Sequence, residues 1–256
     1  MKEGVRFVNS EAELRACYQL RHKVYVEGMG RFFDRSNHEL KELKDEQDKN
    51  ARAVLAVKNN KPIGTLRLFW GGDMSFTQEQ SEAYRLSIFK SLLNKDKICI
   101  VERLMIDDKY RGSMTALRMY KEVMDFVVKQ QAEVVLLDCE PHHLEAYLKL
   151  GFRPFAKQYH YPGIGAVIPM ALVVGDYHHL KQVGSPFSML LTENDLNYCQ
   201  YTEKLKKIVS IDHEDGNQLS ISNNIVSRKI YNARHKLLAK RSELFDSRLR
   251  SRLCAC

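Results

Sequence analysis

The order of apolar and polar residues along the chain alternates between short β-rich runs and longer segments with helical spacing. Apolar runs bounded by turn residues predict strands at residues 5–8, 53–57, 63–69, 98–106 and 134–137, and a hairpin over residues 152–159 and 166–174 that bends at 162–165. Apolar residues three and four positions apart predict helices at residues 10–25, 82–93, 113–131 and 144–150. Ser10 and Glu13 match a capping box, and Gly151 would end the last of these helices.

Strands and helices in this order predict a mixed α/β (α+β) domain over residues 1–190. Residues 28–50 are polar and highly charged, and they form either a solvated loop or a mobile cover over a site. Residues 191–256 have little strand character, and residues 223–253 resemble one or two basic helices. We therefore expect a basic, mainly helical C-terminal extension.

Composition indicates an ordinary soluble protein with an excess of positive charge. Hydrophobic residues make up 44% and charged residues 28% of the 256 residues, and the formal net charge is +8. No apolar run is long enough for a transmembrane helix, and the first residues lack the apolar core of a signal peptide. We therefore expect a cytoplasmic protein, and the net charge favours an anionic partner without naming it.

The cysteines and the paired histidines do not have the pattern of a metal site. Cys17, Cys99 and Cys139 lie in apolar segments, and no two cysteine pairs have zinc-ligand spacing. The adjacent His142 and His143 point to different sides of a helix. We expect reduced cysteines that behave as small hydrophobic residues, and no bound metal ion.

Residues 98–116 combine a strand, a tight polar turn and the start of a helix. A helix N-terminus carries unpaired N–H groups and a partial positive charge, which suit a phosphate or pyrophosphate. Arg111 adds a full charge beside that end, and Gly112, Ser113 and Thr115 are small enough for a ligand to approach the backbone. The same pattern is also typical of an ordinary strand–helix unit with a serine cap.

Residues 111–116, Arg-Gly-Ser-Met-Thr-Ala, resemble the pyrophosphate loop of the GNAT acyltransferases, and residues 147–152 resemble that family's Tyr-x-x-x-Gly-Phe element. Glu140-Pro141 stands where the family often has Asn-Pro. The resemblance implies a GNAT-type, mostly antiparallel sheet flanked by helices, and an acyl thioester of phosphopantetheine as co-substrate. It places this donor at Leu104, Ile106, Arg111, Gly112, Ser113, Met114, Thr115 and Ala116. Met114 replaces the usual loop glycine and indicates a divergent branch.

Further motifs are similar to those of the N-acyl amino acid synthases and, more distantly, the acyl-homoserine-lactone synthases, GNAT relatives that take long acyl chains from acyl carrier protein. These motifs occupy residues 21–27, 64–68, 102–104 and 169–187, and the resemblance covers residues 5–190. It implies an N-acyltransferase that moves an acyl chain from acyl carrier protein or acyl-CoA to the amine of an amino acid or similar small amine. The alternatives are an acetyl-CoA-dependent acetyltransferase and a non-catalytic GNAT-fold binding or sensor protein.

Glu102 is predicted to be the general base of a direct attack by the amine on the thioester. It lies within an apolar strand, where an unpaired charge is costly, and partial burial would suit it to accept the ammonium proton. The alternative is a structural ion pair with Arg67 or Arg103. The GNAT pattern makes the backbone N–H of Leu104 the donor to the carbonyl oxygen. It also implies that Tyr147 donates its hydroxyl to the departing thiolate, with a packed tyrosine as the alternative.

Four residues are predicted to act on the acceptor. The guanidinium groups of Arg67 and Arg103 suit a carboxylate of the acceptor or a neighbouring aspartate, with surface or network roles as the alternative. Arg21 would help to order residues 28–50 over the substrate, and Tyr25 lies in the same helical motif. Asp48 is a weaker candidate, for which a solvated charge is the favoured interpretation.

Residues 228–252 form a basic segment with several possible roles. Its basic residues are Arg228, Lys229, Arg234, Lys236, Lys240, Arg241, Arg248, Arg250 and Arg252. The segment either packs an apolar stripe on the main domain, docks acidic acyl carrier protein, or contacts an anionic membrane surface. It lacks the interleaved aromatic residues typical of single-strand nucleic-acid binding, so we expect no nucleic acid partner.

Overall fold

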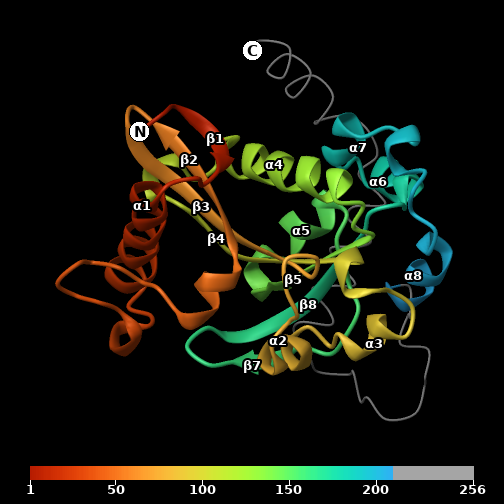
Figure 1. Ribbon diagram of the computed structural model, residues 1–256, viewed down its shortest axis with the longest axis horizontal. Coiled ribbons are helices and arrows are strands. Elements are labelled where there is room, and N and C mark those ends of the chain that lie inside the picture. Colours follow the sequence, from red (N-terminus) through yellow and green to blue (C-terminus); the bar gives the residue numbers. More distant parts are fainter. Residues whose placement is uncertain (210–256) are drawn as a thin grey trace.

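The computed structural model describes residues 1–209, which form an eight-stranded sheet with helices on both faces (Figure 1). The strands are β1 (Gly4–Phe7), β2 (Arg52–Lys58), β3 (Lys61–Trp70), β4 (Ile98–Ile106), β5 (Val134–Cys139), β6 (Arg153–Pro154), β7 (Tyr159–Tyr161) and β8 (Gly165–Val173). The α-helices are α1 (Glu11–Arg21), α2 (Gln78–Ala83), α3 (Ser87–Lys90), α4 (Thr115–Lys129), α5 (Leu144–Leu150), α6 (Tyr177–Gln182), α7 (Phe187–Leu190) and α8 (Thr202–Val209). A π-helical segment, η1 (His22–Gly28), continues α1, and the short 3₁₀ turns are η2 (Phe33–Arg35), η3 (Glu46–Asn50), η4 (Lys95–Lys97), η5 (Asp108–Tyr110), η6 (Pro141–His143) and η7 (Asn194–Leu196).

The sheet is mixed and mostly antiparallel. Its strands follow the order β1-β2-β3-β4-β5-β8-β6, and β7 also pairs with β8. Within the described residues, β4 and β5 are the one parallel pair, and the other paired strands run antiparallel. This arrangement confirms the predicted mixed, mostly antiparallel sheet with flanking helices.

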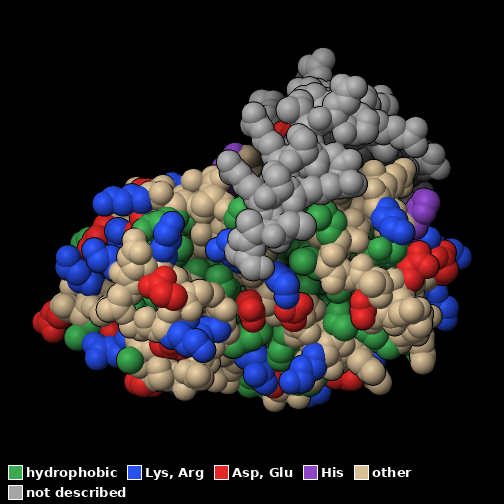
Figure 2. Space-filling model, turned by 90° about the horizontal axis from the view of Figure 1, so that it is seen from above, with side chains coloured by type: hydrophobic (Ala, Val, Ile, Leu, Met, Phe, Trp, Pro, Cys, Tyr) green, Lys and Arg blue, Asp and Glu red, His purple; other side chains and the backbone are tan. Residues whose placement is uncertain are grey.

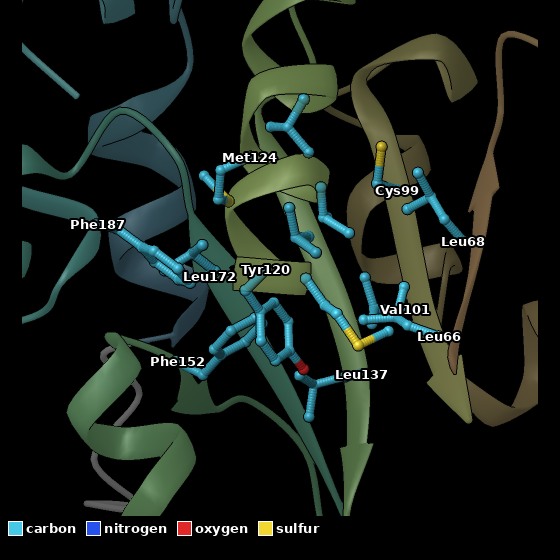
Figure 3. Packing of buried hydrophobic residues seen from close by; sticks show 14 of the residues in the cluster. Leu66, Leu68, Cys99, Val101, Tyr120, Met124, Leu137, Phe152, Leu172 and Phe187 are labelled. Atoms are coloured by element: carbon cyan, nitrogen blue, oxygen red, sulfur yellow. The ribbon is translucent and has the colours of Figure 1, made fainter. Parts of the chain in front are cut away.

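Helices α4, α5, α6 and α7 cover one face of the sheet. Apolar residues of α4 at helical spacing are buried against β3, β4 and β5, and Figure 3 shows Tyr120 of α4 beside Phe152 and Leu137. Gly64 of β3 allows α4 to approach closely, because a Cβ atom at this position would lie 2.8 Å from the sulfur of Met119. Gly64, the first residue of the motif at residues 64–68, therefore has a packing role.

Helices α1, α2, α3 and α8 cover the opposite face. Leu205 and Val209 of α8 join an apolar cluster with residues of β4, β5 and β8, and Leu191 and Leu196 join the cluster on the first face. Residues 191–209 therefore pack against the same sheet as the residues that precede them. The domain division at residue 190 stays a prediction, and the basic segment 228–252 lies outside the described residues.

The prediction of one continuous helix over residues 82–93 is wrong, because this region contains the end of α2 and the separate short helix α3. Helices α2 and α3 are separated by a turn in which Arg85 has a φ of +48°. The turn buries Tyr84 and Leu86, which are 4% and 0% exposed. Burial of two residues so close together overrides the helical spacing of their neighbours.

Two other local predictions hold in part. Ser10 caps α1 by accepting a hydrogen bond from the N–H of Glu13 (3.3 Å), but the Glu13 carboxylate accepts from Arg6 and from the N–H of Asn9. The predicted hairpin ends in β8 as expected, but its first strand is divided into β6 and β7, which pair with different parts of β8.

The surface carries charges of both signs, which are interspersed over the face seen in Figure 2. Among residues 1–209, no helix has the length and apolar character required to cross a membrane. Cys17, Cys99 and Cys139 are free thiols buried in the apolar clusters.

Candidate active site

A β-bulge in β4 lies beyond the point at which β4 leaves β5. The ladder between the two strands covers only Ile98–Ile100 of β4. On the β3 side the register shifts after the pair Arg67–Glu102, so that Arg103 and Leu104 together face one residue of β3. Arg103 has a φ of +52°, which is uncommon for a residue other than glycine. The backbone of Leu104, the predicted donor to the carbonyl, thus lies where β4 has no described pairing with β5.

Arg67 is the centre of a buried ionic network. Its guanidinium, 2% exposed, donates two hydrogen bonds to Glu102, at 2.5 and 3.1 Å. It also donates to Asp45 (2.6 Å) and Asp48 (3.2 Å). Burial opposes the charged form of Arg67, but the three carboxylates raise its pKa above the ordinary value. Arg21, also buried, donates to Asp48 at 2.6 Å.

Arg103 joins this network through Asp45, to which it donates a hydrogen bond. Four predicted site residues, Arg21, Arg67, Glu102 and Arg103, are therefore brought together. The favoured interpretation of Asp48 as a solvated charge is wrong, because its side chain is 2% exposed and ion-paired with two arginines. The acidic residues around it in the sequence concealed this role.

Glu102 is held from two sides. Arg67 binds Oε2, and the hydroxyl of Tyr84 donates to Oε1 at 2.9 Å. The predicted alternative, an ion pair with Arg67, is therefore present. A carboxylate has lone pairs beyond those used here, and Glu102 remains 16% exposed, so it can accept a further hydrogen bond. Tyr84 was not identified from the sequence, since it precedes Glu102 by 18 residues in a segment predicted as a continuous helix.

Residues 28–50 are anchored to the rest of the site. Arg31 donates two hydrogen bonds to Glu140, at 3.0 and 2.9 Å, and so ties this segment to the end of β5. Phe32 packs its ring against Tyr25 (5.1 Å between centroids), and a Cβ atom on Gly163 would lie 2.8 Å from the Phe32 ring. The segment therefore contacts both the residue that follows β5 and the turn between β7 and β8, which is the arrangement expected of a cover over the site.

Tyr147 lies on α5 within an aromatic group. Its ring packs edge to face on Phe152 (5.8 Å) and Tyr120 (6.5 Å). Burial raises the pKa of Tyr147 to about 12, and the Tyr25 hydroxyl contributes to the same shift. The packed tyrosine that we considered as the alternative is therefore observed, and the hydroxyl remains a protonated donor at neutral pH.

The loop before α4 has the open backbone that a phosphate requires. Gly112 has a φ of +74°, and a Cβ atom built at this position would have no neighbouring atom within 4 Å. Met114 is the N-cap of α4, and its side chain makes no capping hydrogen bond. Ser113 Oγ accepts from the N–H of Thr115 (3.3 Å), so the serine cap that we considered as the alternative is formed in part. Arg111 is half exposed and pairs with Asp108 at 2.6 Å. Apart from buried Thr115, the predicted donor-binding residues, including Leu104, Ile106 and Ala116, are exposed or half-buried.

Other features of the described residues lie outside this site. Two surface hollows, of about 410 Å³ beside Phe7 and Leu14 and about 270 Å³ beside Leu92 and Tyr198, contain none of the predicted site residues. Residues 1–209 contain no group of three or more histidine, cysteine or acidic side chains arranged to hold a metal ion.

A sequence profile for the N-acyl amino acid synthase FeeM matches residues 16–173. The chain belongs to the FeeM family of N-acyl amino acid synthases. This FeeM-family chain is therefore an acyltransferase that moves an acyl group to an amine. No curated protein sequence matches it at a significant level.

Solved structures show the same fold at low sequence identity. FeeM from uncultured soil microbes superposes with a TM-score of 0.57 and 14% identity, over 75% of this chain and 99% of that chain. BjaI, a CoA-dependent acyl-homoserine lactone synthase with MTA, gives a TM-score of 0.56 and 16% identity, over 72% and 91% of the two chains. These likenesses confirm the GNAT-type fold.

Proposed function

We propose that this FeeM-family chain transfers an acyl chain from a phosphopantetheine thioester to the amine of an amino acid or a similar small amine. The observation that carries the proposal is the bulge of β4. It brings Glu102 and the Leu104 backbone to the place where β4 diverges from β5. The Arg67 network supports the proposal, because two hydrogen bonds from Arg67 fix the Glu102 carboxylate there.

The reaction is a direct attack of the amine nitrogen on the thioester carbonyl carbon. The N–H of Leu104 stabilises the negative charge that develops on the carbonyl oxygen. The C–N bond forms and the C–S bond breaks. Of the two protons that the ammonium group loses, one passes to Glu102 and the other ends on the departing sulfur. Tyr147 donates a hydrogen bond to this sulfur, because its raised pKa keeps the hydroxyl protonated.

Arg103 is the arginine proposed to bind the acceptor carboxylate. It is 15% exposed and donates to Asp45, the most exposed acid of the network at 33%. Arg21 and Arg67 are almost fully buried, so their proposed contribution is to hold Asp48 and Glu102 in position. Tyr25, packed on Phe32, would form the neighbouring wall of the acceptor site.

Arg111 is proposed to bind the pyrophosphate of a CoA donor beside the N-terminus of α4. The variant Arg111→Ala is expected to raise KM for acyl-CoA by about 10- to 150-fold and to leave kcat unchanged, since one hydrogen bond to a charged group contributes about 1.5–3 kcal/mol. Steady-state kinetics with varied acyl-CoA checks this. Lys121→Ala is the matched control, because Lys121 lies further along α4 and is similarly exposed (49% against 51%). Equal KM values in the two variants would contradict the assignment.

The basic segment 228–252 is proposed to dock acyl carrier protein as a donor. Replacing Arg248, Arg250 and Arg252 together with glutamine in the full chain is expected to slow association with holo acyl carrier protein, because charge complementarity mainly accelerates encounter. Stopped-flow binding at low and high salt checks this, with CoA-dependent turnover as the control. Unchanged association at low salt would exclude docking here, and binding of the native chain to anionic vesicles would favour the membrane role.

One experiment tests the proposed function as a whole. The purified chain is incubated with acyl-CoA or acyl carrier protein thioesters of several chain lengths and a mixture of amino acids, and the products are identified by mass spectrometry. We expect N-acyl amino acids with a long acyl chain. Only acetylated product would favour an acetyltransferase, and no product with any donor would favour a binding protein.

A further inference from the structure

Asp138 of β5 and Glu102 of β4 occupy equivalent positions on two diverging strands. In the parallel ladder, Ile98 pairs with Val134 and Ile100 with Leu136, and the next step of the same register is Glu102 with Asp138. Ile100 and Leu136 lie in the same apolar cluster, and side chains two apart in a strand share a face. The two carboxyl groups therefore lie side by side on the same face, one step beyond the apolar pair Ile100 and Leu136, where the strands separate.

The surroundings of Asp138 differ from those of Glu102. The hydroxyl of Tyr159, on β7, donates to Oδ2 of Asp138 at 2.5 Å, whereas Oδ1 is buried and has no hydrogen-bond partner among the described residues. The groups that shift the pKa of Asp138 are Tyr159, Glu102 and Tyr84, and none of the three is a cation. Burial raises the pKa of Asp138 to about 7. Hydrogen bonding by Tyr159 and Tyr84 lowers this pKa, and the charge of Glu102 raises it.

Tyr84 connects the two carboxyl groups. It donates to Glu102 at 2.9 Å. The strand register, continued by one step, sets Asp138 opposite Glu102, the acid to which Tyr84 donates. Burial raises the pKa of Tyr84, and the charges of Glu102 and Asp138 raise it further. A hydroxyl can accept a proton on one side while it donates on the other. Glu102 is less suited to keep a proton, because a protonated Glu102 would weaken its ion pair with Arg67.

We propose that Asp138 is the group that stores the proton released by the amine, with Tyr84 as the bridge from Glu102. This inference rests on the proposed function. The ammonium N–H bond breaks and its proton moves to Glu102. Protonated Glu102 donates to the Tyr84 oxygen, the Tyr84 O–H turns to Asp138, and the two protons shift together. The result is ionised Glu102, neutral Tyr84 and protonated Asp138, which later releases the proton to water. Asp138 does not contact the substrate in this scheme. It acts through Glu102, from which it receives the proton, and is therefore a positioning residue.

The pH dependence of kcat tests this step in the full-length chain. The native enzyme is expected to lose activity below about pH 7, as Asp138 becomes protonated before turnover. Asp138→Asn is expected to lower kcat about 100-fold. It should also remove the acid limb of the pH profile, which is the fall in kcat below about pH 7. Tyr159→Phe removes a hydrogen bond that lowers the pKa of Asp138, so its acid limb is expected to move to higher pH with an unchanged alkaline plateau. Tyr161→Phe, a change at the other end of the same three-residue strand, is the control and should keep the native limb.

A titration of carboxyl-labelled aspartate by NMR supplies a readout apart from activity. We expect one aspartate signal with a midpoint near 7 that is absent in Asp138→Asn, higher in Tyr159→Phe and lower in Glu102→Gln. Product formation with a native acid limb in both Asp138→Asn and Tyr159→Phe would overturn the inference and leave the proposed function intact. Absence of product from the native chain with every donor would overturn both.

Discussion

Glu102→Gln is expected to lower kcat for acyl transfer by about 100- to 10,000-fold, the usual contribution of a positioned general base. Glutamine keeps the size of the side chain and can still accept a hydrogen bond from Arg67, but it cannot take a proton from the amine. Arg67 retains Asp45 and Asp48 as partners, so the variant should fold. Single-turnover rates with acyl-CoA and an amino-acid acceptor measure the effect.

Two comparisons separate this chemical role from a structural one. Glu145→Gln changes an exposed glutamate of α5 that pairs with Lys149, and it should leave kcat unchanged. Far-UV circular dichroism and the thermal midpoint of Glu102→Gln should stay near the native values. A folded Glu102→Gln variant with native turnover would leave Glu102 only the ion pair with Arg67 and would remove it from the mechanism.

Asp48→Ala is expected to destabilise the fold by about 3–5 kcal/mol, the cost of removing one partner from a buried ion pair. Asp48 is 2% exposed, and it accepts hydrogen bonds from the equally buried Arg21 and from Arg67. Its loss leaves the guanidinium of Arg21 buried without its acid. Urea denaturation followed by circular dichroism measures the free energy of unfolding.

Asp45→Ala is the matched control for Asp48→Ala. Asp45 also binds Arg67, but it is 33% exposed, so its removal should cost clearly less. An equal loss in both variants would contradict the view that burial sets the effect.

The effect of Asp48 should also depend on pH with a defined sign. Burial alone would raise the pKa of Asp48, but Arg21 and Arg67 lower it below its usual value. A lowered carboxyl pKa stabilises the folded state above the pKa of the unfolded chain, and this stabilisation is lost as the pH falls. The difference in stability between the native chain and Asp48→Ala should therefore shrink in acid.

Much of the fold followed from the apolar pattern. Strand β4 and helix α5 have the predicted bounds, because each has a strong local signal. In β4 the signal is a β-rich apolar run interrupted by Glu102 and Arg103, and in α5 it is a glycine stop. The break between α2 and α3 was not predicted, because it depends on where Tyr84 is buried in the folded core.

The site was predictable where its residues are neighbours in sequence or belong to a motif, as for Glu102, Arg103 and the loop at Arg111. Asp138 and Tyr159 lie 21 residues apart, and their hydrogen bond exists only because β5 and β7 both pair with β8. The sequence left three roles open for Arg67: an acceptor carboxylate, a neighbouring aspartate or an ionic network. In the structure three acids from two distant segments surround it. A local sequence pattern cannot predict which distant segments will meet at one side chain.

The packing of α8 has a practical consequence for work with shortened chains. Leu205 and Val209 lie on the sheet face formed by Ile100, Val134 and Val173. A chain that ends at residue 190 would leave this apolar surface open to water, and exposed apolar patches promote aggregation. A soluble fragment for crystallisation or NMR should therefore extend at least through Val209.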